Sequence, residues 1–329
     1  MSNINTNTSF AVLGSNGAIS PFVIDALAKH SGVKKLIVLS RPRPSSSSKP
    51  SNLPANAELV AVDYNNHSAL VEVFTKYSTD VVISTLSDAA IFDAQKKAAV
   101  AAREAGVKVF VPVEFGNVTI GLAGKGERNG EGEGEDDIQV KKNRFAEFLK
   151  SIELPYIHVF TGLWLRWISW VFGYDVNQKF NIIGKGETPA SFTAEEDIGG
   201  FLAHILTTLP LSQLSNTHFR LQGERLTVRQ IADRLGKPYV TNVEAIPGSG
   251  PSDWKFRTLI TSQCDSGVGS TGWDHFTQKD NPGPGPNPMS GKGEGEGQGK
   301  EGKEVKTRKP RGVGINFGKD MFGRGWRTS

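Results

Sequence analysis

The chain has 329 residues, of which 37% are hydrophobic and 22% charged, and its formal net charge is +4. This length suffices for one large α/β domain, or for a nucleotide-binding domain with a smaller companion. The single cysteine, Cys264, excludes an intramolecular disulfide and a cysteine-based zinc or iron–sulfur site. Because basic and acidic residues are interleaved along the chain, the small net charge does not indicate nucleic-acid binding.

The chain also lacks the patterns of export, membrane insertion and metal binding. Its first residues form neither the basic nor the apolar segment of a secretory signal peptide. The most apolar stretch, residues 159–173, is too short to span a bilayer and contains Arg166. The six histidines show no spacing to carboxylates that is typical of a metal site. We therefore expect a cytoplasmic protein, with the nucleus as the alternative location, and neither a metal nor a membrane partner.

Five apolar strands alternate with helical patterns in the first part of the chain. The strands are predicted over 10–14, 35–39, 58–62, 80–84 and 108–112, and the helices over 21–30, 67–77 and 92–105. Runs of Val, Ile and Leu separated by helices are typical of a parallel sheet that is buried on both faces. The pattern predicts an α/β fold with a Rossmann-like, doubly wound parallel sheet.

The second part of the chain is less regular. Its helices are predicted over 138–152, 163–172, 194–208 and 227–235, and its strands over 156–160 and 218–221. A further apolar-periodic segment runs over 254–264. Gly and Glu dominate residues 121–137, which we interpret as a mobile insertion because few of their side chains can pack.

These patterns divide the chain into three parts. Residues 8–160 are predicted to form an NAD(P)-binding Rossmann domain, and residues 161–265 a smaller α/β substrate-binding subdomain, some of whose elements can return to the Rossmann sheet. Residues 266–329, rich in Gly, Pro and charge, are predicted to be a low-complexity and largely disordered tail.

A glycine-containing turn joins the first strand to the first helix. Gly14 suits the tight turn, Gly17 lets the backbone approach a pyrophosphate, and the helix N-terminus presents amide groups to the anion. Ser20 stands where a third Gly or Ala is usual, and a purely structural turn is the alternative. The residues predicted to bind the diphosphate of a dinucleotide are Gly14, Ser15, Asn16, Gly17, Ala18 and Ile19.

Two arginines follow the second strand, where an NAD site would have an acidic residue. Arg41 and Arg43 come directly after Ser40, and the next acidic residue along the chain is Glu58. A guanidinium group binds a 2′-phosphate through paired hydrogen bonds, whereas a carboxylate would repel it. The sequence therefore favours NADP(H) over NAD(H). The alternative is that the arginines only keep a loop soluble.

Two further strand ends carry candidate cofactor contacts. The carboxyl ends of parallel strands form the ligand crevice of such folds. Small polar residues at the fourth strand suit a nicotinamide ribose, although a plain strand end is the alternative. The residues predicted to contact the cofactor at these two ends are Ser84, Thr85, Leu86, Glu114 and Phe115.

At these motifs the chain resembles the NmrA-like family, and within it the isoflavone-reductase-like branch. The resemblance covers about residues 8–265 and is carried by segments 14–20, 80–85, 95–105, 106–116, 154–160 and 192–199. It implies an atypical short-chain dehydrogenase with an NADP-binding Rossmann domain and a small C-terminal domain. Some members of the family are NADPH-dependent reductases, whereas others bind the dinucleotide and act as redox-responsive regulators.

The resemblance also implies a catalytic lysine on the helix before the segment that begins at Leu154. That position is Lys142 in this sequence, which contains no Tyr-x-x-x-Lys pair. An ammonium group beside the nicotinamide donates a proton or hydrogen bond as the hydride reaches the substrate. The alternative is a solvated helix face, since Lys141, Arg144 and Lys150 lie on the same helix. The Gly- and Glu-rich insertion and the low-complexity tail depart from the family pattern.

Aromatic residues mark a candidate substrate wall. Trp164, Trp167 and Trp170 are spaced three apart, which places them on one face of the predicted helix over 163–172. Trp164 and Trp167 are the predicted substrate contacts, because indole rings stack on flat aromatic compounds. The alternative is that these rings pack the core of the subdomain.

Two functions from different classes fit this sequence. The first is an NADPH-dependent oxidoreductase that reduces a small aromatic, enone or carbonyl substrate. The alternative is a dinucleotide-binding redox sensor that docks on a regulatory protein partner without catalysis. A third reading, RNA binding by residues 311–327, is disfavoured because glutamates dilute the charge just upstream. Lys142 distinguishes the first two, since a sensor does not need an ammonium group near the nicotinamide.

Overall fold

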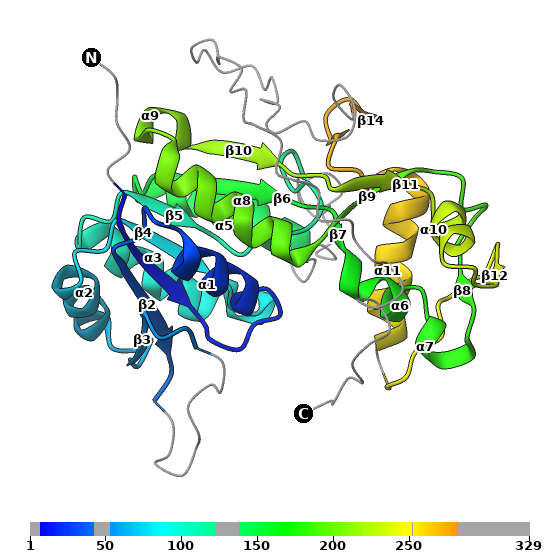
Figure 1. Ribbon diagram of the computed structural model, residues 1–329. Coiled ribbons are helices and arrows are strands. Elements are labelled where there is room, and N and C mark those ends of the chain that lie inside the picture. Colours follow the sequence, from blue (N-terminus) through cyan, green and yellow to red (C-terminus); the bar gives the residue numbers. More distant parts are fainter. Residues whose placement is uncertain (1–6, 43–52, 123–137, 252, 282–329) are drawn as a thin grey trace. The chain divides into compact units, whose positions relative to one another are not determined.

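The computed structural model describes residues 7–42, 53–122, 138–251 and 253–281. The chain divides into two compact units, which we call unit 1 and unit 2 (Figure 1). Unit 1 comprises Met1–Phe115, Thr119–Val159 and Glu195–Phe219, and unit 2 comprises Gly116–Val118, Phe160–Ala194 and Arg220–Ser329. Arg43, nearly all of the predicted insertion and most of the predicted tail lie outside the described residues.

Unit 1 contains a five-stranded parallel sheet with the order β3-β2-β1-β4-β5. The strands are β1 (Ser9–Leu13), β2 (Lys35–Ser40), β3 (Ala57–Ala61), β4 (Val81–Ser84) and β5 (Val109–Val111). Leu13, at the end of β1, pairs with Leu39 of β2 on one side and with Ser84 of β4 on the other. The strand order therefore reverses at β1, which is where α/β folds bind ligands. The Rossmann-like fold predicted from the sequence is confirmed.

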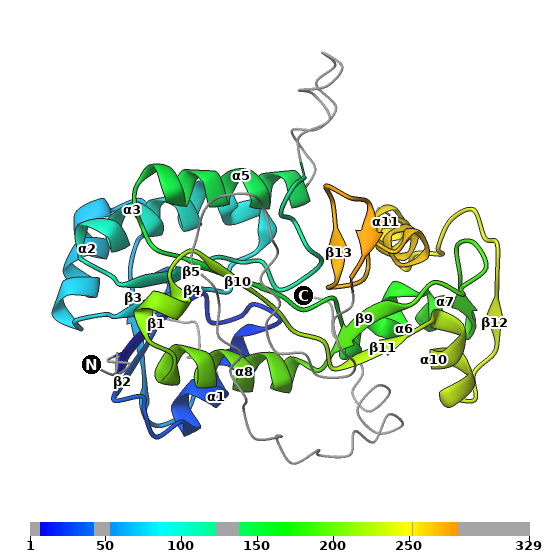
Figure 2. The same ribbon diagram turned by 90° about the horizontal axis from the view of Figure 1, so that it is seen from above.

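Helices cover both faces of this sheet (Figure 2). The helices are α1 (Ser20–Lys29), α2 (His67–Lys76), α3 (Lys96–Glu104), α5 (Ile138–Ser151), α8 (Glu195–Thr208) and the short α9 (Leu211–Leu214). Helices α1 and α8 lie on one face, and α2, α3 and α5 on the other. The strands between them are apolar and almost completely buried in β1, β2, β4 and β5, because neither face of the sheet reaches solvent.

Local signals explain where these helices begin. Pro21 lies in the first turn of α1, where its missing amide hydrogen costs no hydrogen bond. The Asn66 side chain caps α2 by accepting a hydrogen bond of 3.0 Å from the Ala69 amide. The helix predicted over 92–105 begins differently: the 3₁₀ turn η1 (Asp88–Ala90) and the π-helical turn η2 (Ile91–Gln95) precede α3.

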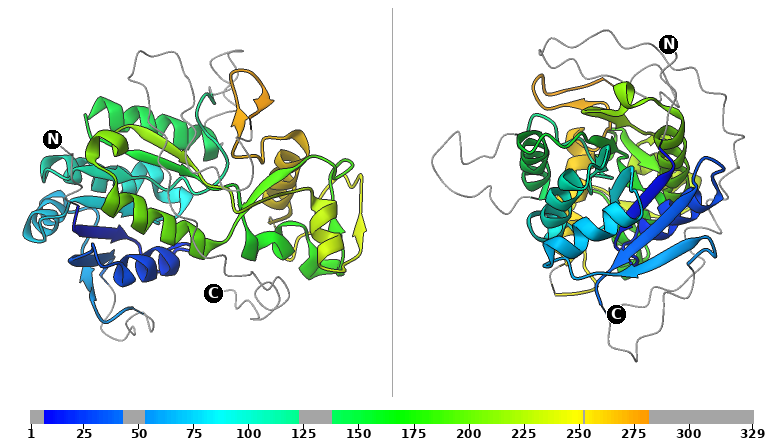
Figure 3. Two further views of the ribbon diagram at one scale, coloured as in Figure 1. Left: turned by 45° about the horizontal axis from the view of Figure 1, so that its top comes forward. Right: turned by 90° about the vertical axis from the view of Figure 1, so that its left-hand side faces the viewer.

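Segments from the second half of the chain complete unit 1. Strand β6 (Ile157–Phe160) pairs with β10 (Thr217–Arg220), and Tyr156, just before β6, forms a parallel bridge with Phe110 of β5. Helix α8 packs closely on α1, since a Cβ atom at Gly199 would lie 2.3 Å from the Phe22 carbonyl oxygen. The end view in Figure 3 shows the sheet between the layer of α1 and α8 and the layer of α2, α3 and α5.

Unit 2 is built from short strands and helices around a second core. Its strands are β7 (Leu163–Trp164), β8 (Phe180–Asn181), β9 (Ala190–Thr193), β11 (Glu224–Leu226), β12 (Tyr239–Val240), β13 (Trp273–Asp274) and β14 (Lys279–Asp280). Its helices are η3 (Leu165–Trp167), α6 (Ile168–Val171), α7 (Tyr174–Asn177), α10 (Val228–Arg234) and α11 (Asp253–Ser266). Buried residues of β8, β9, α6 and α10 share one apolar cluster.

Two expectations for this part of the chain are corrected. The predicted aromatic helix over 163–172 begins as a strand, because Leu163 and Trp164 pair with Phe192 and Thr193 of β9. Pairing with a distant strand thus overrides the local helical spacing. The predicted tail begins with ordered structure, since β13 and β14 form an antiparallel hairpin. The Asp280 carboxylate of this hairpin accepts hydrogen bonds from Arg225 and Ser270.

The described residues contain no helix with the length and apolar character needed to cross a membrane. Nor, within those same ranges, do three or more His, Cys, Asp or Glu side chains gather as metal ligands would.

Candidate functional site

The glycine turn between β1 and α1 lies against the end of β4. Gly14 has a φ of +90°, a conformation that side chains disfavour. A Cβ atom at Gly17 would lie 2.2 Å from the Thr85 carbonyl oxygen. Gly17 is therefore required by the protein's own backbone, a reason that the sequence pattern did not reveal. Within the turn, Asn16 and Ala18 are exposed, whereas Ile19 is buried.

Two buried hydroxyl groups hold this turn in place. The Ser20 and Thr85 hydroxyl oxygens are 2.7 Å apart, and the Ser20 hydroxyl oxygen also lies 3.1 Å from the Gly14 carbonyl oxygen. Thr85 donates to the Leu13 carbonyl at 2.8 Å. The Thr85 side chain thus supports the turn, and its predicted contact with a cofactor stays a prediction. The Ser84 hydroxyl is buried and has no hydrogen-bond partner among the described residues.

The start of α1 suits an anion. The N-cap residue Ile19 makes no side-chain cap, and the first turn of the helix contains no acidic residue. No carboxylate of this turn therefore opposes the positive end of the helix dipole. A pyrophosphate group fits this environment.

Arg41 lies one residue beyond β2 and is exposed. Its charge acts on Tyr64, a buried residue beyond β3 whose hydroxyl donates to the Leu39 carbonyl at 3.2 Å. Burial raises the pKa of Tyr64, and the Gly14 amide and Arg41 oppose that rise. The Tyr64 hydroxyl group therefore interacts both with the Gly14 amide of the turn and with the charge of Arg41. Sequence reasoning missed it, although its place just after a strand of the sheet was the available signal.

The loop after β5 is fixed by neighbouring side chains. The Gln95 side-chain oxygen accepts a hydrogen bond of 2.9 Å from the Val113 amide. Glu114 and Phe115, two predicted cofactor contacts, are both buried, and Phe115 has a φ of +23°. Leu86, which follows β4 and was also predicted to contact the cofactor, is half-buried.

Lys142, on α5, points its ammonium group at this loop. Its Nζ atom donates to the Glu114 carbonyl oxygen at 3.1 Å and lies 3.2 Å from the Asp88 carboxylate. Only 14% of its side chain is exposed. By contrast, Arg144 on the same helix is exposed. The ammonium group of Lys142 is thus fixed by two contacts within the protein, whereas the alternative interpretation expected a freely solvated lysine.

The Glu114 carboxyl group turns into the interior of unit 1. It accepts a hydrogen bond of 3.2 Å from the Thr119 hydroxyl, and it lies 3.8 Å from His158 Nε2. Burial raises the pKa of Glu114 to about 7, and Lys142 and Thr119 oppose that rise. Burial lowers the pKa of His158 to about 3. Despite their proximity, Glu114 and His158 are therefore not an ion pair at neutral pH, because the imidazole is uncharged.

The predicted substrate residues Trp164 and Trp167 belong to unit 2, whereas the glycine turn and Lys142 belong to unit 1. The Trp164 and Trp167 rings meet edge to face at 6.2 Å between centroids, and Trp167 and Trp170 do so at 5.3 Å. All three rings are half-buried. They form a continuous aromatic row even though they do not share one helix.

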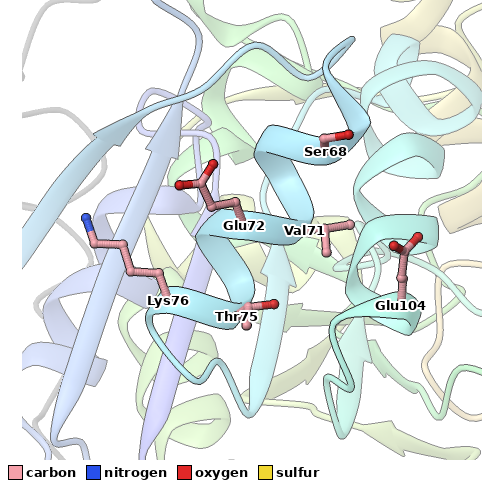
Figure 4. Close-up of a pocket in the computed structure, with 6 residues that line it drawn as sticks. All are labelled: Ser68, Val71, Glu72, Thr75, Lys76 and Glu104. Carbon is pink, nitrogen blue, oxygen red and sulfur yellow. The ribbon is translucent and has the colours of Figure 1, made fainter.

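Two open depressions on the surface contain none of the predicted site residues. One, of about 430 Å³, lies over α2 and the end of α3 in unit 1 (Figure 4). Its lining residues are Ser68, Val71, Glu72, Thr75, Lys76 and Glu104. The other, of about 420 Å³, is in unit 2 and includes Asn177, Ile246 and Trp254. We place the candidate site at the carboxyl end of the sheet instead, because the Lys142 ammonium group and the N-terminus of α1 lie there.

The strand order and the glycine turn define a Rossmann-type α/β protein. Residues 6–249 match the model of the NmrA-like family, and the chain belongs to this family. The predicted resemblance is confirmed.

Two curated proteins of low sequence identity to this chain carry the names of a reductase and an oxidoreductase. The chain is 27% identical over 208 residues to an isoflavone reductase homolog from Solanum tuberosum. This match covers 57% of this chain and 61% of that protein. It is 27% identical over 241 residues to an NmrA-like family domain-containing oxidoreductase from Gibberella moniliformis, covering 69% of this chain and 76% of that protein. The match to the Solanum protein thus spans less than two thirds of its length.

Solved structures show the same fold. The structure of leucoanthocyanidin reductase from Vitis vinifera in its binary complex with NADPH superimposes with a TM-score of 0.60 at 20% identity. The superposition covers 79% of this chain and 88% of that one.

Proposed function

We propose that the protein is an NADPH-dependent oxidoreductase that reduces a small aromatic, enone or carbonyl substrate by hydride transfer. The observation that carries this proposal is the position of Lys142. Its ammonium group is largely buried between the Glu114 carbonyl and the Asp88 carboxylate, in the unit that also contains the glycine turn. A merely solvating lysine has no need of this arrangement.

The residues around the turn fit NADPH. The backbone of Gly14–Ile19 would hold the diphosphate at the N-terminus of α1, which has no acidic residue in its first turn. Arg41 would bind the 2′-phosphate, together with Arg43, which lies outside the described residues. The ends of β4 and β5, at Ser84–Leu86 and Glu114–Phe115, would flank the nicotinamide. The Vitis relative, whose structure contains NADPH, supports this choice.

NADPH supplies the hydride, and the protein supplies position and charge. Lys142 would donate a hydrogen bond or proton to the substrate oxygen or carbon that gains electron density. The Asp88 carboxylate, 3.2 Å from Nζ, helps to hold the ammonium group in this position. Trp164 and Trp167 are the proposed contacts for a flat aromatic substrate, which is also the class that the names of the plant relatives suggest.

The test begins with binding and ends with turnover. Purified protein is titrated with NADPH and with NADH, and aromatic enones and carbonyl compounds are then screened for NADPH oxidation. We expect tighter binding of NADPH, and turnover that Lys142→Ala abolishes while NADPH binding persists. Lys141→Ala, a change at the neighbouring position of the same helix, is the matched control. Binding of NADPH without turnover of any compound would favour the sensor and its protein partner.

A further inference from the structure

Glu114 contributes two separate groups to the surroundings of Lys142. Its main-chain oxygen accepts the hydrogen bond from Lys142 Nζ at 3.1 Å. Its side chain, 1% exposed, turns the other way and accepts from the Thr119 hydroxyl at 3.2 Å. A carboxyl group removed from water needs such partners. The position of the Glu114 main-chain oxygen, which holds Lys142, therefore depends on the buried Glu114 carboxyl group, whose hydrogen bond is to Thr119 and not to Lys142.

The loop that carries this oxygen is held by side chains at two successive residues, and the third residue has a strained backbone. The Val113 amide is held by Gln95, the Glu114 carboxyl by Thr119, and Phe115 has a left-handed φ of +23°. A non-glycine residue in that region is strained and is maintained only by its surroundings. The bond between Glu114 and Thr119 brackets Phe115, so it is the contact best placed to maintain this conformation.

The charge of the Glu114 carboxyl group is set by its neighbours on several elements. These are Lys142 on α5, Asp88 on η1 and His158 on β6. The charges of His218 on β10 and Lys150 on α5 act in turn on His158. His158 is uncharged at neutral pH because burial lowers its pKa to about 3. Burial raises the pKa of Glu114 to about 7, and Lys142 acts against that rise. Glu114 therefore changes charge near neutral pH within the field of the ammonium group.

We propose that Glu114 is a positioning residue for Lys142: its buried carboxyl group fixes the loop whose carbonyl oxygen holds the ammonium, and its charge lowers the reactivity of Lys142 toward electrophiles. An ionised carboxylate nearby favours the ammonium form of a lysine over the free amine. The effect on catalysis rests on the function proposed above. The electrostatic coupling of the two residues does not, because it needs neither cofactor nor substrate.

The coupling is tested by the reactivity of Lys142. Full-length protein is labelled with a trace of acetic anhydride between pH 6 and 10, and acetylation of each lysine is measured by mass spectrometry. In Glu114→Gln, which keeps the shape and removes the charge, Lys142 should be acetylated at least about threefold faster than in the wild type near pH 9. Glu72→Gln, at an exposed position of α2, is the matched control and should leave Lys142 unchanged.

A second variant covers the case in which Glu114→Gln does not fold. Thr119→Val removes the donor to the carboxylate, which shifts the ionisation of Glu114 to higher pH. Acetylation of Lys142 should then be faster than in the wild type near pH 7.5 and converge with it above pH 9, and Thr119→Ser should restore the wild-type curve. Curves that coincide with the wild type for folded Glu114→Gln and Thr119→Val would overturn the proposal. An absence of turnover would instead count against the reductase and leave the acetylation result intact.

Discussion

The hydroxyl oxygens of Ser20 and Thr85 lie 2.7 Å apart and join the first turn of α1 to the end of β4. Both groups are buried, and both hydroxyl oxygens also lie within hydrogen-bond distance of carbonyl groups of the Leu13–Gly14 segment. Ser20 occupies the position where a third small residue is usual in dinucleotide-binding turns. From that position its hydroxyl group stabilises the turn through its contacts with Gly14 and Thr85. The shape of the proposed diphosphate site is thus determined by contacts within the protein.

Gly17→Ala should destabilise the turn. The added Cβ atom would lie 2.2 Å from the Thr85 carbonyl oxygen, so the backbone has to shift. We expect a loss of about 1–3 kcal/mol in the free energy of unfolding, measured in urea, together with weaker NADPH binding. Gly200→Ala is the control, because nothing lies within 4 Å of its added Cβ atom and the site is helical. Equal stability of the two variants would contradict this account of the turn.

Arg41→Ala should reduce the preference for NADPH. If the guanidinium group binds the 2′-phosphate, its loss weakens NADPH binding by about tenfold or more and leaves NADH binding unchanged. Isothermal titration with both cofactors measures the two affinities. Arg103→Ala, an exposed change at the end of α3, is the control. A parallel loss of affinity for both cofactors would show that Arg41 does not recognise the phosphate.

Glu114→Gln should alter the dependence of stability on pH. The pKa of Glu114 is 4.5 in the unfolded reference and about 7 in the folded protein. The folded state therefore binds more protons in this interval, and the stability contributed by Glu114 is present below pH 4.5 and lost as pH rises through 7. Glutamine does not titrate, so the stability of the variant relative to the wild type should rise between pH 5 and 8, by at most about 3 kcal/mol.

Urea unfolding at several pH values measures this difference. His158 titrates in the opposite sense, but it is present in both proteins and does not affect the comparison to first order. Glu72→Gln should give a curve parallel to that of the wild type. A difference between Glu114→Gln and the wild type that stays constant over this pH range would refute the prediction.

Arg257→Lys should destabilise unit 2. The buried Arg257 guanidinium group donates to both carboxylate oxygens of Asp175, at 2.6 and 3.0 Å, and to Asp253 at 2.9 Å. It also lies 4.4 Å from the centroid of the Trp170 ring. Lysine cannot reproduce this fork, so we expect a loss of about 3 kcal/mol in thermal or urea unfolding. An exposed control is Arg234→Lys, and comparable stability of the two variants would contradict the prediction.

The sequence predicted the sheet of unit 1 well because its strands are short, apolar and bounded by glycine and polar turns. It failed at Trp164, where pairing with β9 overrides local spacing. It also failed at the hairpin of β13 and β14, which adjoins the low-complexity residues and which Arg225 anchors through Asp280. Neither contact leaves a local pattern, since the partners are distant along the chain.

The candidate site shows the same division. Glycines in the turn and Lys142 could be proposed from motifs and family resemblance. The inward direction of the Glu114 carboxyl group and the position of Tyr64 beneath the turn could not, because both depend on how separate strand ends meet. Conversely, Thr85 was proposed only as a cofactor contact, which stays a prediction, and the support that its hydroxyl group gives to the turn was not foreseen.

The most direct test of the proposed function is deuterium transfer from NADPH labelled at C4 to the best substrate of the screen. We expect wild-type protein and Lys141→Ala to incorporate deuterium into the product, and Lys142→Ala to bind NADPH normally but to incorporate deuterium at least about a hundredfold more slowly. Incorporation by Lys142→Ala at the wild-type rate would contradict the role of Lys142. Failure of the wild-type protein to transfer deuterium to any substrate would contradict the reductase itself.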